Sequence, residues 1–190
     1  MLKPWLIILV HQLVFQTMFV AKNAVLQKKI GKPIRGKNRE ATLSIVVFAV
    51  YVGTTLVLGL MEHPVGRVRF VPDLYAMVTG NVFLLLSIVI AAASLLGLKD
   101  SWRVGIPEDQ QTVLISTGIY RFTRNPYFLA YLIMFAGYTL ILQNIMLLAL
   151  LLISMAIVHA MIRKEEAHLA NMHGADYDVY RKKVPRYLFW

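Results

Sequence analysis

The sequence predicts an all-α integral membrane protein with five transmembrane helices. Hydrophobic residues make up 58% of the 190 residues, and the mean hydropathy is +0.61, whereas soluble domains are roughly half apolar. The excess lies in five long blocks with few charges: 4–21, 41–61, 74–98, 126–142 and 145–162. A helix of about 20 residues spans the hydrocarbon core of a bilayer. Five such blocks are too many to be hidden in a chain this small, which argues against a soluble helical protein.

The first block predicts a membrane span rather than a signal peptide. It contains His11, Gln12 and Gln16, and no small-x-small cleavage site follows it. Polar residues inside a span usually hydrogen-bond within the protein, so we expect His11 to be a bonded interior residue rather than a catalyst. For the same reason we expect Asn81, in the third block, to bond a neighbouring helix.

The last two apolar blocks are separated by Gln143-Asn144 alone. This spacing predicts a tight helical hairpin, and its two arms are short for membrane-spanning helices.

The basic residues are distributed unevenly between the two sides of a five-helix bundle. If the flanks of the spans alternate between sides, 17 of the 20 Lys and Arg residues fall on one side and three on the other. This asymmetry predicts an external N-terminus and a cytoplasmic C-terminus. The basic stretch 28–40 then lies at the membrane surface, where it suits anionic lipid headgroups better than nucleic acid.

We expect one structural domain made of two functional parts. Residues 1–98 form a three-span scaffold, in which 61–73 is an external connector. Residues 99–190 form a second part that contains a polar loop (99–125), the hairpin (126–162) and a charged tail. The loop and the tail share the predicted cytoplasmic side, so together they can close a pocket there.

Three motifs in the second part carry a resemblance to a known family. They are "TVLISTGIYRFTRNPYF" (112–128), "IRKEEAHL" (162–169) and "GADYDVYRKKVPR" (174–186). Their order and spacing resemble the isoprenylcysteine carboxyl methyltransferases and the related membrane phospholipid methyltransferases. In these families Gly-x-Tyr, Arg-His-Pro-x-Tyr, an apolar hairpin, a Glu-Glu pair, Gly-x-x-Tyr-x-x-Tyr and Val-Pro appear in this order. The resemblance covers roughly residues 95–190.

The resemblance implies a methyltransferase that uses S-adenosyl-L-methionine and releases S-adenosyl-L-homocysteine. It implies a cytoplasmic cofactor pocket formed by the 99–125 loop and the C-terminal tail. Carried over residue by residue, the expected cofactor-binding residues are Thr112, Val113, Leu114, Ile115, Tyr120, Arg124, Asn125, Pro126, Phe128 and Glu165.

The chemistry of these residue types agrees with the cofactor. Val113 to Ile115 can give adenine an apolar slot with backbone hydrogen bonds. The ring of Tyr120 suits a cationic sulfonium, although Tyr120 and Phe128 are also consistent with an interfacial aromatic belt. Glu165 can accept hydrogen bonds from the ribose or the amino group, and Arg124 can neutralise the cofactor's carboxylate.

The sequence departs from the family pattern at three positions. Asn125 replaces the histidine of Arg-His-Pro, and Phe128 replaces the tyrosine that follows. Met161 stands four residues before Glu165, where the eukaryotic carboxyl methyltransferases have an arginine for the substrate carboxylate. Arg163 is the nearest arginine, so we name it as the candidate catalytic residue that orients the acceptor. A straight helix places it about 200° from Glu165.

The predicted acceptor is a small lipophilic molecule that enters from the bilayer. A carboxylate, as in an isoprenylcysteine, needs no base, whereas a phospholipid amine must first lose a proton. The candidate bases for that step are His159, Glu166 and His168.

The chain has no cysteine and no cluster with metal-ligand spacing. The alternatives are a phospholipid amine N-methyltransferase, a nicotinamide-dependent sterol reductase and a non-catalytic membrane assembly protein. A monomer can hold the whole predicted site.

Overall fold

The computed structural model describes residues 3–31, 34, 39–104 and 113–188, without the side chains of residues 40 and 41. Its six α-helices are α1 (Pro4–Ile30), α2 (Arg39–Leu60), α3 (Asp73–Gly97), α4 (Pro126–Leu142), α5 (Ile145–His173) and α6 (Ala175–Lys183). Two short 3₁₀ helices are η1 (Lys99–Ser101) and η2 (Gly118–Arg121). The described residues form no strand, and the predicted all-α class is confirmed.

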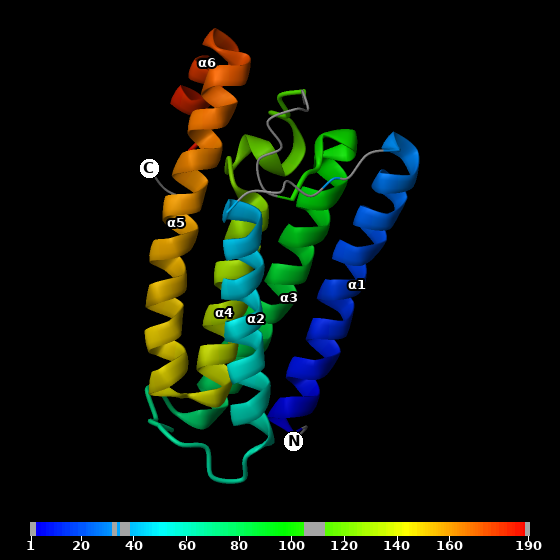
Figure 1. The fold of residues 1–190 in the computed structure, drawn as a ribbon. Coiled ribbons are helices and arrows are strands. Elements are labelled where there is room, and N and C mark those ends of the chain that lie inside the picture. The colour runs from blue at the N-terminus through cyan, green and yellow to red at the C-terminus, as the bar shows by residue number, and fades with distance from the viewer. Residues whose placement is uncertain (1–2, 32–33, 35–38, 105–112, 189–190) are drawn as a thin grey trace.

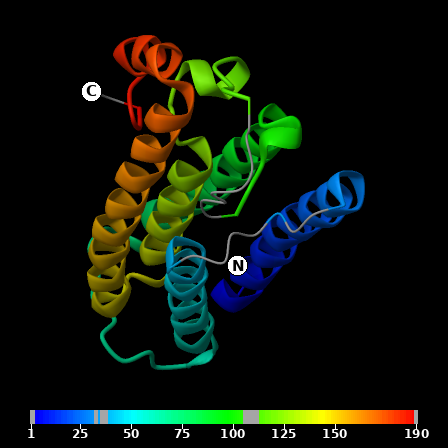
Figure 2. The same cartoon turned by 45° about the horizontal axis from the view of Figure 1, so that its top comes forward.

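The five long helices lie side by side and alternate in direction (Figure 1). In both views α1 and α5 stand at opposite edges of the bundle (Figure 2), while α4 contacts each of the other four long helices. One end carries the α2–α3 loop and the α4–α5 turn, and we call residues 61–72 and 143–144 the loop end. The opposite end carries η2, α6 and the charged part of α5. We call residues 98–104, 113–125 and 163–188 the tail end.

Four of these helices are long and apolar enough to cross a membrane. They are α1, α3, α5 and the part of α2 from Thr42 to Leu60. The apolar run of α5 ends at Ile162, so we take 145–162 as its spanning segment and the charged residues after it as lying beyond the span. The predicted fifth span, 126–142, is the 17-residue helix α4, which is shorter than the other four.

The turn between α4 and α5 is a tight hairpin, as the sequence predicts. Gln143 ends α4 in the left-handed conformation with φ 45°. The side chain of Asn144 then accepts a hydrogen bond from the backbone N–H of Met146 and caps the N-terminus of α5. Two residues therefore suffice to reverse the chain.

The loop end is covered by the α2–α3 loop, which does more than connect two helices. The Val68 N–H donates to the Gln143 carbonyl at 2.8 Å, and the Ile145 N–H donates to the Gly66 carbonyl at 2.9 Å. The Asn144 amide donates to the Val65 carbonyl at 2.7 Å. Gln143 and Asn144 are buried by these contacts, so this end of the bundle is closed.

Helices α3 and α4 approach each other closely at two glycines. A Cβ on Gly80 would lie 2.6 Å from Ile141 Cγ1 and 3.0 Å from the Gly137 carbonyl oxygen. Small residues permit such close packing between membrane helices. This contact fixes α4 against α3, whose C-terminal end reaches the tail end.

Polar side chains in the interior hold α1 against α3 and α4. His11 Nδ1 is 2.7 Å from the Tyr138 hydroxyl, and His11 Nε2 is 3.0 Å from the Ser87 hydroxyl. The Gln12 amide donates to the Tyr138 hydroxyl at 2.7 Å. His11 is therefore a bonded interior residue, as predicted. The expectation for Asn81 was wrong, because its amide bonds the Met77 carbonyl of its own helix.

Candidate functional site

A cavity of about 350 Å³ lies at the tail end of the bundle. Its wall combines the segment after residue 98, the η2–α4 junction, the charged part of α5 and α6. Nine of the ten predicted cofactor-binding residues line it: Val113, Leu114, Ile115, Tyr120, Arg124, Asn125, Pro126, Phe128 and Glu165. Thr112, the tenth, lies outside the described residues. The structure therefore brings together in one cavity residues that are more than 50 positions apart in the sequence.

Tyr120 is fixed in this wall by contacts on both sides. Gly118 has φ 62° and begins η2, which turns the chain toward the bundle. The buried Tyr120 side chain bonds the Ser94 hydroxyl of α3 at 2.8 Å. Its backbone carbonyl accepts a hydrogen bond from the Tyr180 hydroxyl of α6. The ring is thus held between α3 and α6, and burial raises the pKa of its hydroxyl, which stays neutral.

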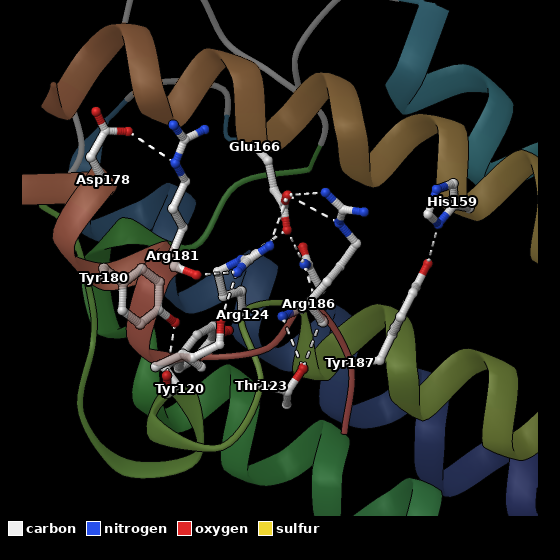
Figure 3. A network of polar contacts seen from close by, with 12 residues as sticks. Tyr120, Thr123, Arg124, His159, Glu166, Asp178, Tyr180, Arg181, Arg186 and Tyr187 are labelled. Carbon is white, nitrogen blue, oxygen red and sulfur yellow. Dashed lines mark hydrogen bonds and ion pairs between the residues drawn. The ribbon is translucent and has the colours of Figure 1, made fainter. Parts of the chain in front are cut away.

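Glu166 is the centre of a buried ionic cluster, which we call the Glu166 cluster and define as Arg124, Asn125, Glu166 and Arg186 (Figure 3). Arg124 donates to both carboxylate oxygens of Glu166, at 3.0 and 3.2 Å. Arg186 donates through Nε and Nη2 at 3.1 and 2.9 Å, and the Asn125 amide donates at 2.9 Å. The cluster thereby joins the start of α4, the end of α5 and the tail.

The hydrogen bonds of the cluster decide the charge of Glu166. Burial alone would raise the pKa of its carboxyl, but the bonds from Arg186, Arg124 and Asn125 together outweigh burial and hold that pKa below the usual range. The same contact raises the pKa of Arg186. Glu166 is therefore an ionised structural anion rather than an available base.

Arg124 also binds the tail through neutral groups. Its Nη1 donates to the carbonyls of Arg181 and Val184, at 2.8 and 2.6 Å, and its backbone N–H donates to the Pro185 carbonyl. Four of the donors of the guanidinium are thus bound within the protein. A cofactor carboxylate would have to compete with these contacts for Arg124, so the expected neutralisation stays a prediction.

Glu165, the neighbour of Glu166, has a different environment. Its half-buried side chain lines the cavity and makes no hydrogen bond or ion pair with any residue that the structure describes. Burial, and secondarily the charge of Glu166, raises the pKa of the Glu165 carboxyl to about 7. A cation bound beside it would restore its charge and lower that pKa. One glutamate of the pair stabilises the fold, while the other faces the cavity.

The remaining polar candidates are distributed between the cavity and the surface. His168 lines the cavity, whereas His159 lies 3.1 Å from the Tyr187 hydroxyl. Arg163 is exposed and does not line the cavity. This agrees with its expected separation from Glu165 around the helix, and its role toward an acceptor stays a prediction.

Sequence reasoning missed the wall that α1 and α2 contribute. Gln16, Phe19, Ser44, Ile45 and Phe48 also line the cavity. Trp102 joins them, and its indole N–H donates to Asn23 of α1 at 2.8 Å. The predicted scaffold, residues 1–98, thus contributes residues to the cavity wall. The predicted division of the chain into a scaffold and a catalytic part stays a prediction. Gln16 was visible as a polar residue in an apolar block, but nothing local showed which way it faced.

Comparison with known proteins shows the family to which the chain belongs. Residues 75–176, more than half of the chain, match the model of a family described as phospholipid methyltransferase. The chain belongs to this phospholipid methyltransferase family. It is also similar to the protein-S-isoprenylcysteine O-methyltransferase of Schizosaccharomyces pombe, with 26% identity over 132 residues. That match covers 68% of this chain and 56% of the relative, so the chain spans little more than half of that protein's length. The resemblance in the motifs is thereby confirmed at the level of the family.

Proposed function

We propose that this chain is an integral membrane methyltransferase that uses S-adenosyl-L-methionine to methylate a small lipophilic acceptor. The observation that carries the proposal is the single cavity in which all nine described cofactor candidates meet. Family membership supports it. The volume of the cavity, about 350 Å³, is at the lower end of the range for small-molecule sites, about 300–1,000 Å³.

The residues of the cavity fit a cationic, partly apolar cofactor. Glu165 offers a carboxylate that no described side chain neutralises, which suits an ammonium or a sulfonium. The held ring of Tyr120 offers an aromatic face for a positive charge. Val113 to Ile115 offer an apolar edge for adenine, and Arg103 is a further cation of the wall.

Catalysis then requires alignment more than acid–base chemistry. When bound, S-adenosylmethionine supplies a methyl group that its positive sulfur already activates. The chain's residues have to hold the acceptor in line with that group and exclude water, and such alignment contributes roughly 7–11 kcal/mol to lowering a barrier. Tyr120, which Ser94 fixes, and Glu165 form the side of the cavity that would hold the cofactor. Asn125 and Arg124 support that side through Glu166.

A carboxylate acceptor needs no proton transfer, and the similarity to an isoprenylcysteine O-methyltransferase favours it. We propose Arg163 as the residue that orients this carboxylate, with the acceptor bringing its polar group to the edge of the cavity. The family description favours an amine of a phospholipid as the second candidate. In that case His168, which lines the cavity, is the candidate base.

We further propose five spans, with α4 as the short central one, and a cytoplasmic tail end. The 17-to-3 distribution of basic residues supports this orientation. In the proposed orientation the cavity is open to a cytosolic cofactor. The acceptor and the surrounding lipids are then the partners, nucleic acid is not, and one copy of the chain holds the whole site.

The test is methyl transfer by the purified chain in lipid vesicles. Radiolabelled S-adenosylmethionine is supplied with either N-acetyl-S-farnesylcysteine or phosphatidylethanolamine, and label is measured in the lipid-soluble product. We expect transfer to one of the two probes, which is lost in the Glu165→Ala variant. A folded chain that transfers no label to either probe would contradict both proposed acceptors, and one that also fails to bind S-adenosylhomocysteine would contradict the proposed function.

A further inference from the structure

Gln16 differs from Gln12, Asn23 and Asn81, three other amide side chains of α1 and α3, which each make a hydrogen bond within the protein. It lies near the middle of α1, in an apolar run, and lines the cavity. Its amide makes no hydrogen bond with any residue that the structure describes. One turn earlier on the same helix, Gln12 donates to Tyr138 and to the Met134 sulfur. His11 and Asn81 are also bonded.

Gln16 is half-buried, and an amide without a hydrogen bond in an apolar span is costly, because hydrocarbon provides no hydrogen bonds in place of water. Such a group is therefore expected where a ligand completes its bonding. The nearby wall contains a second polar side chain, and this one is buried. The hydroxyl of Tyr127 is buried and has no hydrogen-bond partner among the described residues. Tyr127 lines the same cavity, and its ring stacks on that of Phe19 at 6.4 Å.

The surroundings of Gln16 indicate the chemistry of that ligand. Phe19 of α1 and Phe48 of α2 line the cavity with it, and the Phe48 ring lies 5.2 Å from that of Tyr131. This wall is aromatic and comes from apolar helices, whereas the charged cofactor candidates lie on elements after residue 112. It suits an apolar chain that carries a polar group.

We infer that Gln16 determines acceptor specificity by donating an amide hydrogen bond to an oxygen of the lipophilic acceptor. The inference rests on the proposed function and assigns the α1–α2 wall to the acceptor rather than to the cofactor. Gln16 touches the acceptor and takes no part in binding S-adenosylmethionine.

The test compares Gln16→Leu with Gln12→Leu and the parent chain, in the vesicle assay with N-acetyl-S-farnesylcysteine and phosphatidylethanolamine. For Gln16→Leu we expect the KM of the methylated probe to rise about 3- to 10-fold, as for one lost hydrogen bond. Its affinity for S-adenosylhomocysteine should be unchanged, and its melting temperature equal or higher, because an unbonded amide has been removed. Gln12→Leu should instead melt at a lower temperature, because it loses its bond to Tyr138.

An unchanged KM in Gln16→Leu, beside an active parent, would overturn the inference and leave the proposed function standing. A lower melting temperature or weaker S-adenosylhomocysteine binding in this variant would also overturn it, since either would assign Gln16 to the fold or to the cofactor. A parent that binds S-adenosylhomocysteine but methylates neither probe would remove the proposed acceptor classes, and the inference with them. A parent that does not bind the compound at all would refute the function itself.

Discussion

The two ends of the bundle are held together by different kinds of contact. At the loop end, Gln143 and Asn144 are buried by neutral hydrogen bonds to the α2–α3 loop. At the tail end, two arginines and an asparagine converge on Glu166, and a cavity lies beside them. The loop end closes the bundle, whereas the tail end combines the Glu166 cluster with Glu165, a carboxylate that no described residue pairs with.

This difference shows how a small membrane protein can keep a pocket open. A half-buried carboxylate such as Glu165, which no described residue neutralises, is unfavourable, so its neighbourhood has to be fixed by other contacts. The Glu166 cluster provides them, because it joins α4, α5 and the tail around the cavity. Structural and functional acids can then be consecutive residues on one helix.

The largest effect is expected from Glu166→Ala. This variant leaves Arg124 and Arg186 without their shared carboxylate at a largely buried site. We expect a loss of about 3 kcal/mol in the free energy of unfolding, or a melting temperature about 10 °C lower. Thermal unfolding in detergent measures it. Glu165→Ala is the matched control and should melt at or above the temperature of the parent; equal destabilisation of the two variants would remove the distinction between them.

The pH dependence of stability sharpens the same contrast. The pKa of Glu166 is lowered in the folded protein, so its contribution is present at neutral pH and is lost as the pH falls through the acid range. The pKa of Glu165 is raised to about 7, so this group destabilises the fold increasingly as the pH rises toward 7. Glu165→Gln should therefore stabilise the chain at pH 8 and have little effect at pH 4. Melting curves of the parent and Glu165→Gln at both pH values measure whether the substitution raises or lowers the melting temperature.

An intermediate effect is expected on cofactor affinity. Glu165→Gln removes one charged hydrogen-bond partner, so we expect S-adenosylhomocysteine to bind about 10- to 100-fold more weakly. In the parent the affinity should fall as the pH drops below about 7, since binding then has to displace a proton from Glu165. A parent and variant with the same pH profile would show that Glu165 does not contact the ligand.

The smallest effect is expected at the loop end. Asn144→Ala removes the cap of α5 and the bond to Val65, at a cost of about 1–2 kcal/mol. The melting temperature should fall by a few degrees, while the affinity for S-adenosylhomocysteine stays at the parent value. Weaker binding would show that the two ends are coupled.

The sequence predicted the helices well, because apolar blocks and the short polar break at Gln143-Asn144 are local features. The hairpin at Gln143-Asn144 and the start of α4 at Pro126 are examples. The ends of α1 and α5 were less predictable. Both helices continue past their apolar blocks, to Ile30 and His173, because charge marks the edge of the membrane and does not end a helix.

Within the candidate site, only the residues that belong to the sequence motifs could be predicted. The ordered motifs indicated the nine described residues that meet in the cavity, including Glu165. They could not show that Arg124 bonds a glutamate 42 positions away, nor that Gln16 of α1 faces the same cavity. Such contacts depend on how whole helices pack, and no local pattern encodes them.

The most direct test of the account is a calorimetric titration of the purified parent chain with S-adenosylhomocysteine, beside Glu165→Gln and Asn144→Ala. We predict micromolar binding by the parent and by Asn144→Ala, and binding at least 10-fold weaker by Glu165→Gln. If the folded parent shows no binding, or if Glu165→Gln binds as tightly as the parent, the cavity beside the Glu166 cluster is not the cofactor site.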